Sequence, residues 1–231
     1  MQDEILKHSR KIYKSAKDTK HTFWEKAKEI LLEVCIIVFA VTLSIWLHSW
    51  SEHKHEQKEA NKFLIGLKND LKGDIEILKS NKNSSIELNS NYKFLQNVSK
   101  SQSDSIIGPH TTFYMLGTAF NNARYEGFKS SGKIETIEND SLKNAILLYY
   151  QQTIPNLTTG INYLNSFQLE QLKDSQNSPD SLSLYTYYNS KKLKSMLHNI
   201  EYNAEQSIFS FDKAINQAEK IMETIDNEAE R

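Results

Sequence analysis

ILLEVCIIVFAVTLSIWLHSW, at residues 30–50, is the longest apolar stretch of this 231-residue chain. Fourteen residues from Val34 to Leu47 carry no charge, and about twenty helical residues at ~1.5 Å each span the hydrocarbon core of a bilayer. The uncharged run alone also suits a buried helix of a soluble protein, so the residues on its two flanks must distinguish the two possibilities. All three tryptophans of the chain stand at these flanks, where indole rings prefer the membrane–water interface. We therefore predict a single transmembrane helix over residues 30–50. The residues predicted at its two interfaces are Phe23, Trp24, Trp46 and Trp50.

Basic residues around this stretch predict its orientation. Residues 1–29 form a basic tail with eight Lys and Arg against five Asp and Glu. Residues 10–29 hold seven basic side chains and residues 51–70 hold four, so the positive-inside rule puts the N-terminus in the cytoplasm and the C-terminal part outside. The apolar run ends in bulky residues with no small-residue cleavage site after it. We therefore expect an uncleaved anchor rather than a signal peptide.

The overall composition narrows the class of protein. Hydrophobic residues make up 39% of the chain and the mean hydropathy is −0.59 even with the apolar stretch included. The remainder is therefore polar for its size, which suits an elongated helical assembly more than a compact globule. A net charge of −1 gives no reason to expect nucleic acid as a partner. Cys35 is the only cysteine, so no intramolecular disulfide can form.

Residues 51–62, SEHKHEQKEANK, are predicted to form a polar helical stalk. Neither Gly nor Pro occurs between Val34 and Leu64, so the membrane helix can continue out of the bilayer without a break. Lysines recur at every fourth position and glutamates form a second stripe. Because like charges at that spacing destabilise an isolated helix, we expect each stripe to face an opposite stripe in a homo-oligomer or on another membrane protein. The stripes are Lys54, Lys58 and Lys62, and Glu52, Glu56 and Glu59.

A metal site is the alternative interpretation of this stalk. His48, His55 and Glu59 share one helix face, which would bring metal ligands together across an oligomer. His53 and His55, however, are two residues apart on a helix and do not converge. We therefore predict no bound metal, and nothing in the sequence indicates a cofactor.

Apolar residues at three- and four-residue steps predict long helices over the rest of the chain. The expected helices cover about 63–99, 141–172 and 182–228, with a short broken segment over 111–129. The first and last of these are long enough to pair in antiparallel fashion. We therefore predict an all-α fold, in which one N-terminal transmembrane helix continues into an elongated antiparallel helical bundle over residues 63–231.

Local signals refine this prediction. Asn139 or Asp140 is expected to cap the helix that begins at Ser141, because a short polar side chain there accepts free amide hydrogens. The apolar stripe of that helix passes straight through Pro155, which predicts either a kinked helix or two abutting ones. Ile134–Ile137 is the one candidate for an extended piece.

Two stretches resemble a known family. The first runs from Glu33 to Trp50 and continues as FLIGLKNDL at residues 63–71. The second is YEGFKSSGKI at residues 125–134, followed by Asn139, Leu142 and the pair Tyr149-Tyr150. In this order the chain resembles an uncharacterised family of single-span membrane proteins of Gram-negative bacteria, known only as a domain of unknown function. The resemblance implies an inner-membrane location with a periplasmic helical domain, and it supplies no activity.

The segment around the second stretch is where we expect a site. Arg124 is one of only three arginines, and a guanidinium fork suits a carboxylate or a phosphate. One interpretation is a polar ligand pocket between helices. The other, which we favour, is a structural corner in which glycine allows a tight turn, aromatic rings fill the bundle and Arg124 pairs with a neighbouring acid. The residues concerned are Arg124, Tyr125, Glu126, Lys129, Gly132 and Tyr150.

Glu33 is the one acid within the apolar stretch, where a carboxylate is costly. It stands about one helical turn from the predicted cytoplasmic boundary. Three roles fit: an interfacial residue, a contact with a partner span, or part of a proton pathway.

Catalytic motifs are missing from the sequence. It contains no phosphate-binding glycine loop and no H-E-x-x-H, C-x-x-C or G-x-S-x-G motif. We therefore expect a non-enzymatic interaction or scaffold protein, anchored in the lipid bilayer and acting through its periplasmic bundle. The competing hypothesis is a ligand-sensing bundle that signals through a partner protein.

Overall fold

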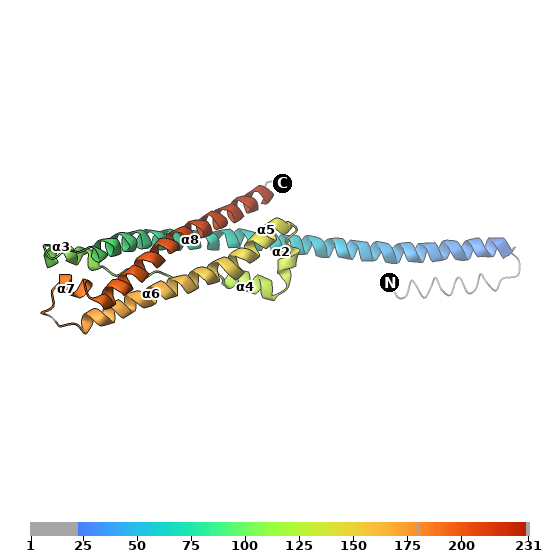
Figure 1. Ribbon diagram of the computed structural model, residues 1–231. Coiled ribbons are helices and arrows are strands. Elements are labelled where there is room, and N and C mark those ends of the chain that lie inside the picture. The colour runs from blue at the N-terminus through green and yellow to red at the C-terminus, as the bar shows by residue number, and fades with distance from the viewer. Residues whose placement is uncertain (1–22, 180, 230–231) are drawn as a thin grey trace. The chain divides into compact units, whose positions relative to one another are not determined.

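The computed structural model describes residues 23–179 and 181–229, and the chain divides into two compact units, residues 1–59 and 60–231. Every regular element among the described residues is helical and none is a strand, which confirms the all-α prediction. Figure 1 shows these elements with their labels.

The first unit contains the beginning of helix α2 (Phe23–Gln96). Between Leu31 and Trp50 this helix exposes nearly all of its large apolar side chains, among them Phe39 at 67% and Ile45 at 61%. Among the described residues, α2 is the one helix long and apolar enough to cross a membrane. The predicted helix is thus present, whereas the crossing itself stays a prediction. The basic tail, residues 1–22, lies outside the described residues.

In the second unit, α2 and α8 (Lys191–Ala229) run antiparallel, as the sequence predicted. Lysines on α2 pair with acids on α8, and residue numbers fall along α8 as they rise along α2. Because most of these side chains are substantially exposed, each pair contributes only about 0–1 kcal/mol, and together they fix the register of the two helices. The pairs are Lys68–Asp226, Lys79–Glu219, Lys82–Asp212 and Lys93–Glu201.

Helix α6 (Ile154–Gln176) packs against α8 and completes the core of this unit. Figure 1 shows α6, α8 and the second half of α2 side by side. The predicted apolar stripes face inward, and burying each large side chain stabilises the fold by roughly 1.5–3 kcal/mol. Fully buried members are Leu67, Leu71, Leu78, Leu164, Leu197, Ile200 and Phe211.

Short elements connect the long helices. After α2 come α3 (Asp104–Ile107) and the 3₁₀ turn η1 (Gly108–Thr111). Helix α4 (Ala123–Ser130) and the 3₁₀ turn η2 (Lys133–Thr136) precede α5 (Asp140–Leu148). Helix α7 (Leu184–Tyr188) links α6 to α8.

The prediction of an extended piece at Ile134–Ile137 is wrong, because these residues belong to the 3₁₀ turn η2 and its C-cap. The amide of Ile137 donates to the carbonyl of Ile134, and both isoleucine side chains are buried. A 3₁₀ turn brings residues three apart to the same side, whereas a strand would send them to opposite faces. Burial of both isoleucines therefore selects the turn.

The start of α5 and the helix boundary near Pro155 agree with the predictions from the sequence. Asn139 caps α5, since its Oδ1 accepts from the Leu142 amide at 3.0 Å. Before Pro155 the chain makes a π-helical turn, η3 (Tyr149–Thr153), so that two helices abut and the proline sits in the first turn of α6. Proline lacks an amide hydrogen and its ring crowds the carbonyl four residues back; the wider turn accommodates both effects.

Residues 112–122 form an extended segment that we call the strap. The strap lies between α2 and α6: the Leu116 amide donates to Asn165 of α6, and the Gly117 amide donates to Asn81 of α2. Helix within the predicted broken segment 111–129 is confined to α4 and to the last residue of η1. The return from the end of α2 to the start of α5 is therefore made by extended chain followed by one short helix.

Candidate functional site

Arg124 lies in α4 and reaches α2. Its Nε donates to Oδ2 of Asp70 at 2.8 Å. The guanidinium lies so close to Gly66 that a Cβ at that position would stand 2.5 Å from it. Glycine thus permits the close approach. The sequence suggested that the Arg124 guanidinium could bind a carboxylate or phosphate of a ligand. In the structure its carboxylate partner is Asp70 of the same chain.

Three buried tyrosines fill the same corner. Tyr125 stacks on Tyr150 with ring centroids 4.6 Å apart, and Tyr149 meets Tyr150 edge-on at 4.9 Å. Gln151 donates to the Tyr125 hydroxyl at 2.8 Å, whereas the buried Tyr150 hydroxyl makes no hydrogen bond within the described chain. Burial raises the pKa of both the Tyr149 and the Tyr150 hydroxyl well above the usual value. These rings form a packed aromatic cluster.

The remaining predicted residues lie at the surface of this corner. Glu126 is exposed, and the Lys129 ammonium stands 5.6 Å from the centroid of the Tyr125 ring. Gly132 has φ +76°, in the left-handed region that favours glycine, and it ends the turn after α4. The ion pair of Arg124, the stacked rings of Tyr125 and Tyr150 and the positive φ of Gly132 are what a structural corner needs, whereas exposed Glu126 distinguishes neither interpretation.

Asp74 is a buried acid that the sequence reasoning passed over. It is 0% exposed, and its Oδ1 accepts from the Asn121 amide at 2.7 Å and from the Asn121 side chain at 3.1 Å. Tyr149 donates to its other oxygen at 3.4 Å. Burial raises the pKa of the Asp74 carboxyl, and these hydrogen bonds oppose the shift because they favour the carboxylate. The available signal was its place inside the apolar stripe, three residues after Leu71.

Three side-chain amides hold the strap by its backbone, and we call them the amide clasp: Asn81, Asn165 and Gln168. Gln168 accepts from the Tyr114 amide at 3.0 Å and donates to the Tyr114 carbonyl at 2.9 Å. Asn165 makes the same pair with Leu116, at 3.0 Å for both bonds. Asn81 makes it with Gly117, at 2.9 and 2.8 Å.

The amide clasp recognises backbone rather than side chains. Each clasp amide offers one donor and one acceptor, which is what a neighbouring β-strand offers to an extended chain. Gln168 and Asn81 are buried at 0% and 4% exposure, so these bonds also satisfy groups that would be costly to leave unpaired. Polar residues at buried-stripe positions were the only sequence signal for this arrangement.

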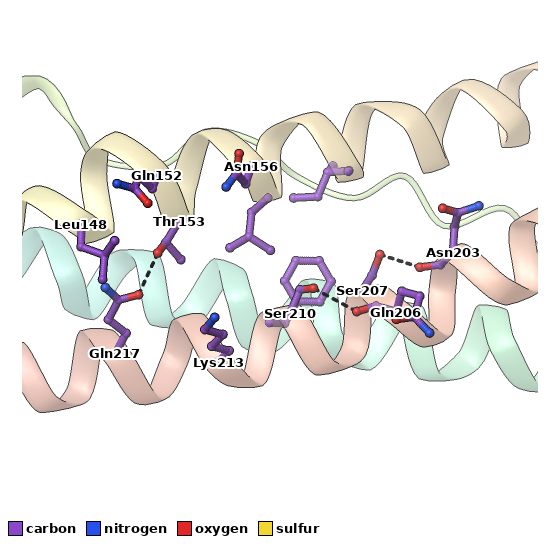
Figure 2. A pocket seen from close by; sticks show the side chains of 14 residues that line it. Leu148, Gln152, Thr153, Asn156, Asn203, Gln206, Ser207, Ser210, Lys213 and Gln217 are labelled. Atoms are coloured by element: carbon purple, nitrogen blue, oxygen red, sulfur yellow. Dashed lines mark hydrogen bonds between the residues drawn. The ribbon is translucent and has the colours of Figure 1, made fainter. Parts of the chain in front are cut away.

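A cleft of about 360 Å³ lies between α6 and α8. Figure 2 shows Gln152 of η3 and Asn156 of α6 along one side, and Asn203, Gln206 and Lys213 of α8 along the other. Ile161 and Phe211, both buried, contribute to its floor. Thr153 and Gln217 bridge the two helices at one end with a 2.8 Å hydrogen bond. The described lining is thus polar at its rim and apolar at its floor.

A second polar cluster stands where α6 ends. The amide oxygen of buried Gln171 accepts from Tyr92 at 2.6 Å, its nitrogen donates to Tyr188 at 3.4 Å, and its backbone carbonyl accepts from Tyr187 at 3.3 Å. Burial raises the pKa of the Tyr188 hydroxyl to about 12. Tyr187 and Tyr188 also line a smaller cleft of about 230 Å³ together with Phe113 of the strap. Gln171 thus satisfies the hydroxyl groups of the three tyrosines around it, whereas Nε2 of the nearby Gln96 is buried without a hydrogen-bond partner in the described chain.

The predicted interface residues lie on α2. Trp24, Trp46 and Trp50 are exposed, at 72%, 62% and 50%, and the Lys54 ammonium stands 3.9 Å from the centroid of the Trp50 ring. Phe23 begins α2, but its side chain lies outside the described part. Glu33 is 9% exposed.

The stalk residues of the metal hypothesis form no metal site in the described chain. His55 pairs with Glu59 at 3.6 Å. No group of three potential ligands that could hold a metal ion occurs among the described residues. Because the hypothesis concerns ligands from several chains of an oligomer, the absence of metal from the stalk stays a prediction.

Comparison of the chain with protein-family models, with curated proteins and with solved structures found no match. The candidate function therefore rests on the residues and their geometry.

Proposed function

We propose that this chain is a non-enzymatic interaction protein, anchored in a membrane by residues 30–50 and acting through its helical second unit. The observation that carries the proposal is the apolar run of α2, nearly all of whose large side chains are exposed from Leu31 to Trp50. An exposed apolar surface of that extent needs a covering, and a lipid bilayer matches its length and its tryptophan-flanked ends.

The use of polar groups in the second unit supports binding rather than catalysis. Arg124 pairs with Asp70, Asp74 holds the strap, and Gln171 satisfies the tyrosines around it. Each of these groups has a partner in the same chain, and Asp74 and Gln171 are also fully buried, which supports a structural role for them. Ligand sensing at Arg124 is the weaker proposal, because its Nε is already engaged in an ion pair with Asp70 of the same chain.

The proposed setting is the inner membrane of a Gram-negative bacterium, with the N-terminus in the cytoplasm and the second unit in the periplasm. The excess of basic residues before the apolar run and the family resemblance support it. The like-charge stripes of the stalk support a homo-oligomer or a complex with another membrane protein.

Native gels of the full chain, extracted from its membrane in mild detergent, test this proposal. Replacing Lys54, Lys58 and Lys62 together by glutamate should lower the size of the complex, because one attractive stripe becomes repulsive. The matched control replaces the exposed residues Lys72, Lys100 and Lys194 by glutamate, which keeps the same change in net charge. A complex of unchanged size in the stalk variant, or equal loss in both variants, would contradict the proposal.

A further inference from the structure

The cleft between α6 and α8 carries the same side-chain chemistry as the amide clasp. Gln152 of η3 and Asn156 of α6 lie on one side of the cleft, and Gln206 of α8 lies on the other. All three side chains are exposed, and their side-chain amide groups make no hydrogen bonds within the described chain. The amide clasp shows what such groups do between helices of this unit: each takes one N–H and one C=O from an extended backbone.

Helix α8 adds apolar contact area beside this cleft. Tyr202, Gln206, Phe209 and Lys213 follow one another at steps of four, three and four, so they share one face of the helix. Phe209 is 72% exposed, the highest value among the large apolar side chains described in the second unit, and Tyr202 is 55% exposed. Exposed aromatic residues beside a polar cleft are typical of sites that bind another protein.

The dimensions and the charge of the cleft define its occupant. Its lining runs from Leu148 to Ile161 on one side, a helical rise of about 20 Å, which an extended peptide covers with about six residues. Lys213 is the one charged side chain among the described lining residues, which favours an acidic side chain on the peptide. The aromatic ring of the lining, Phe211, is buried, so the described cleft offers no open ring for a sugar to stack on.

We propose that the α6–α8 cleft binds an extended peptide segment of a partner protein. Gln152, Asn156 and Gln206 hold the peptide backbone, Lys213 takes an acidic side chain, and Phe209 packs on an apolar side chain. This assignment rests on the proposed function, because it names the class of partner that the second unit binds. Backbone hydrogen bonds then supply affinity, and Lys213 and Phe209 supply specificity.

Peptide selection on the full chain in detergent micelles tests the assignment. The probe is a phage-displayed library of random 12-residue peptides, and the dissociation constants of enriched peptides are measured by fluorescence polarisation. We expect enriched peptides to combine acidic and apolar residues. Gln206→Ala and Phe209→Ala should each weaken binding by about fivefold to tenfold, because truncating an interface contact of this kind costs about 1 kcal/mol or more.

Two exposed positions supply matched controls. Gln176→Ala, near the end of α6, and Ile86→Ala, on α2, remove the same residue type and a comparable apolar side chain away from the cleft. Both should leave peptide binding unchanged. The absence of enriched peptides, or equal binding to the cleft variants and the wild type, would overturn the proposal.

The native-gel experiment separates this proposal from the proposed function. If the cleft variants lose peptide binding while the stalk variant forms a native complex of unchanged size, the cleft assignment is supported and the proposed assembly through the stalk is contradicted. A native complex that responds to the stalk variant, with no cleft-dependent peptide binding, contradicts the cleft assignment alone.

Discussion

Gln168→Ala tests how the strap is held. In the folded protein, the Gln168 side chain is fully buried and makes both of its hydrogen bonds to the Tyr114 backbone. The substitution removes both bonds and leaves one N–H and one C=O of the strap without partners. It changes no ion pair and no large apolar contact, so the effect reports on the amide clasp.

The magnitude follows from the two lost bonds. A net hydrogen bond contributes about 0.5–1.5 kcal/mol, and leaving a buried partner unsatisfied costs about 1–3 kcal/mol. Because Tyr114 is only partly buried, water can reach part of the vacated site. We therefore expect a local loss of about 2–3 kcal/mol. Since every 1.4 kcal/mol is a factor of ten, protection of the Tyr114 amide should fall by about 30-fold to 150-fold.

Hydrogen exchange with residue-resolved mass spectrometry measures this directly on the full chain in detergent. In the wild type, the amides of Tyr114, Leu116 and Gly117 should exchange slowly although they lie outside any helix. Gln176→Ala, an exposed glutamine of the same helix, is the control and should change nothing. Wild-type strap amides that exchange at the rate of an unfolded peptide, or equal protection in Gln168→Ala, would refute the reasoning.

Three further comparisons test the corner and its buried acid, each by urea titration followed by circular dichroism. Gly127→Ala in α4, where a Cβ meets open space, should stabilise by about 0.5–1 kcal/mol, whereas Gly132→Ala should destabilise by about 1–2 kcal/mol because of its positive φ; effects of the same sign would contradict this. Tyr149→Phe should lower the free energy of unfolding by about 1 kcal/mol, since its bond to Asp74 is lost, and Tyr150→Phe should leave it unchanged or raise it. Equal losses would argue against the described hydrogen bonding. The raised pKa of Asp74 means that the folded unit binds more protons than the unfolded chain above its usual value of 3.8, so its contribution to stability falls as the pH rises through that window. Asp74→Asn should flatten this slope, and an unchanged slope would show that the shift belongs to another group.

The long helices and their pairing were predictable because their signals are local. Stripes at three- and four-residue steps gave the second half of α2 and the body of α8, and Asn139 marked the start of α5. Pro155 narrowed the middle helix to two alternatives, one of which is found as the π-helical turn before α6. Each of these features depends on residues that are neighbours in sequence.

The strap and its clasp were not predictable in the same way. In the sequence, Gln168 looks like any polar residue of an amphipathic helix. Its burial is explained by its hydrogen bonds to the Tyr114 backbone, a partner that the sequence does not indicate. The role of Asp74 likewise depends on a hydrogen bond from Asn121, which is 47 residues away in the sequence. The prediction of an extended piece at Ile134–Ile137 was wrong because four residues with isoleucine only at the two ends are too short for their pattern to separate a strand from a 3₁₀ turn. At the predicted corner the signals are local, because glycine suits the positive φ of Gly132 and the aromatic residues suit a packed cluster.

Labelling of Cys35 with a polyethylene-glycol maleimide in intact native membranes tests the central claim, that α2 anchors the chain in a bilayer. Cys35 is the only cysteine of the chain and is exposed on α2, within the apolar run. If lipid covers the run, a bulky water-soluble reagent cannot reach the thiol, so labelling should occur only after the membranes are dissolved in SDS. Complete labelling in intact membranes would contradict the account.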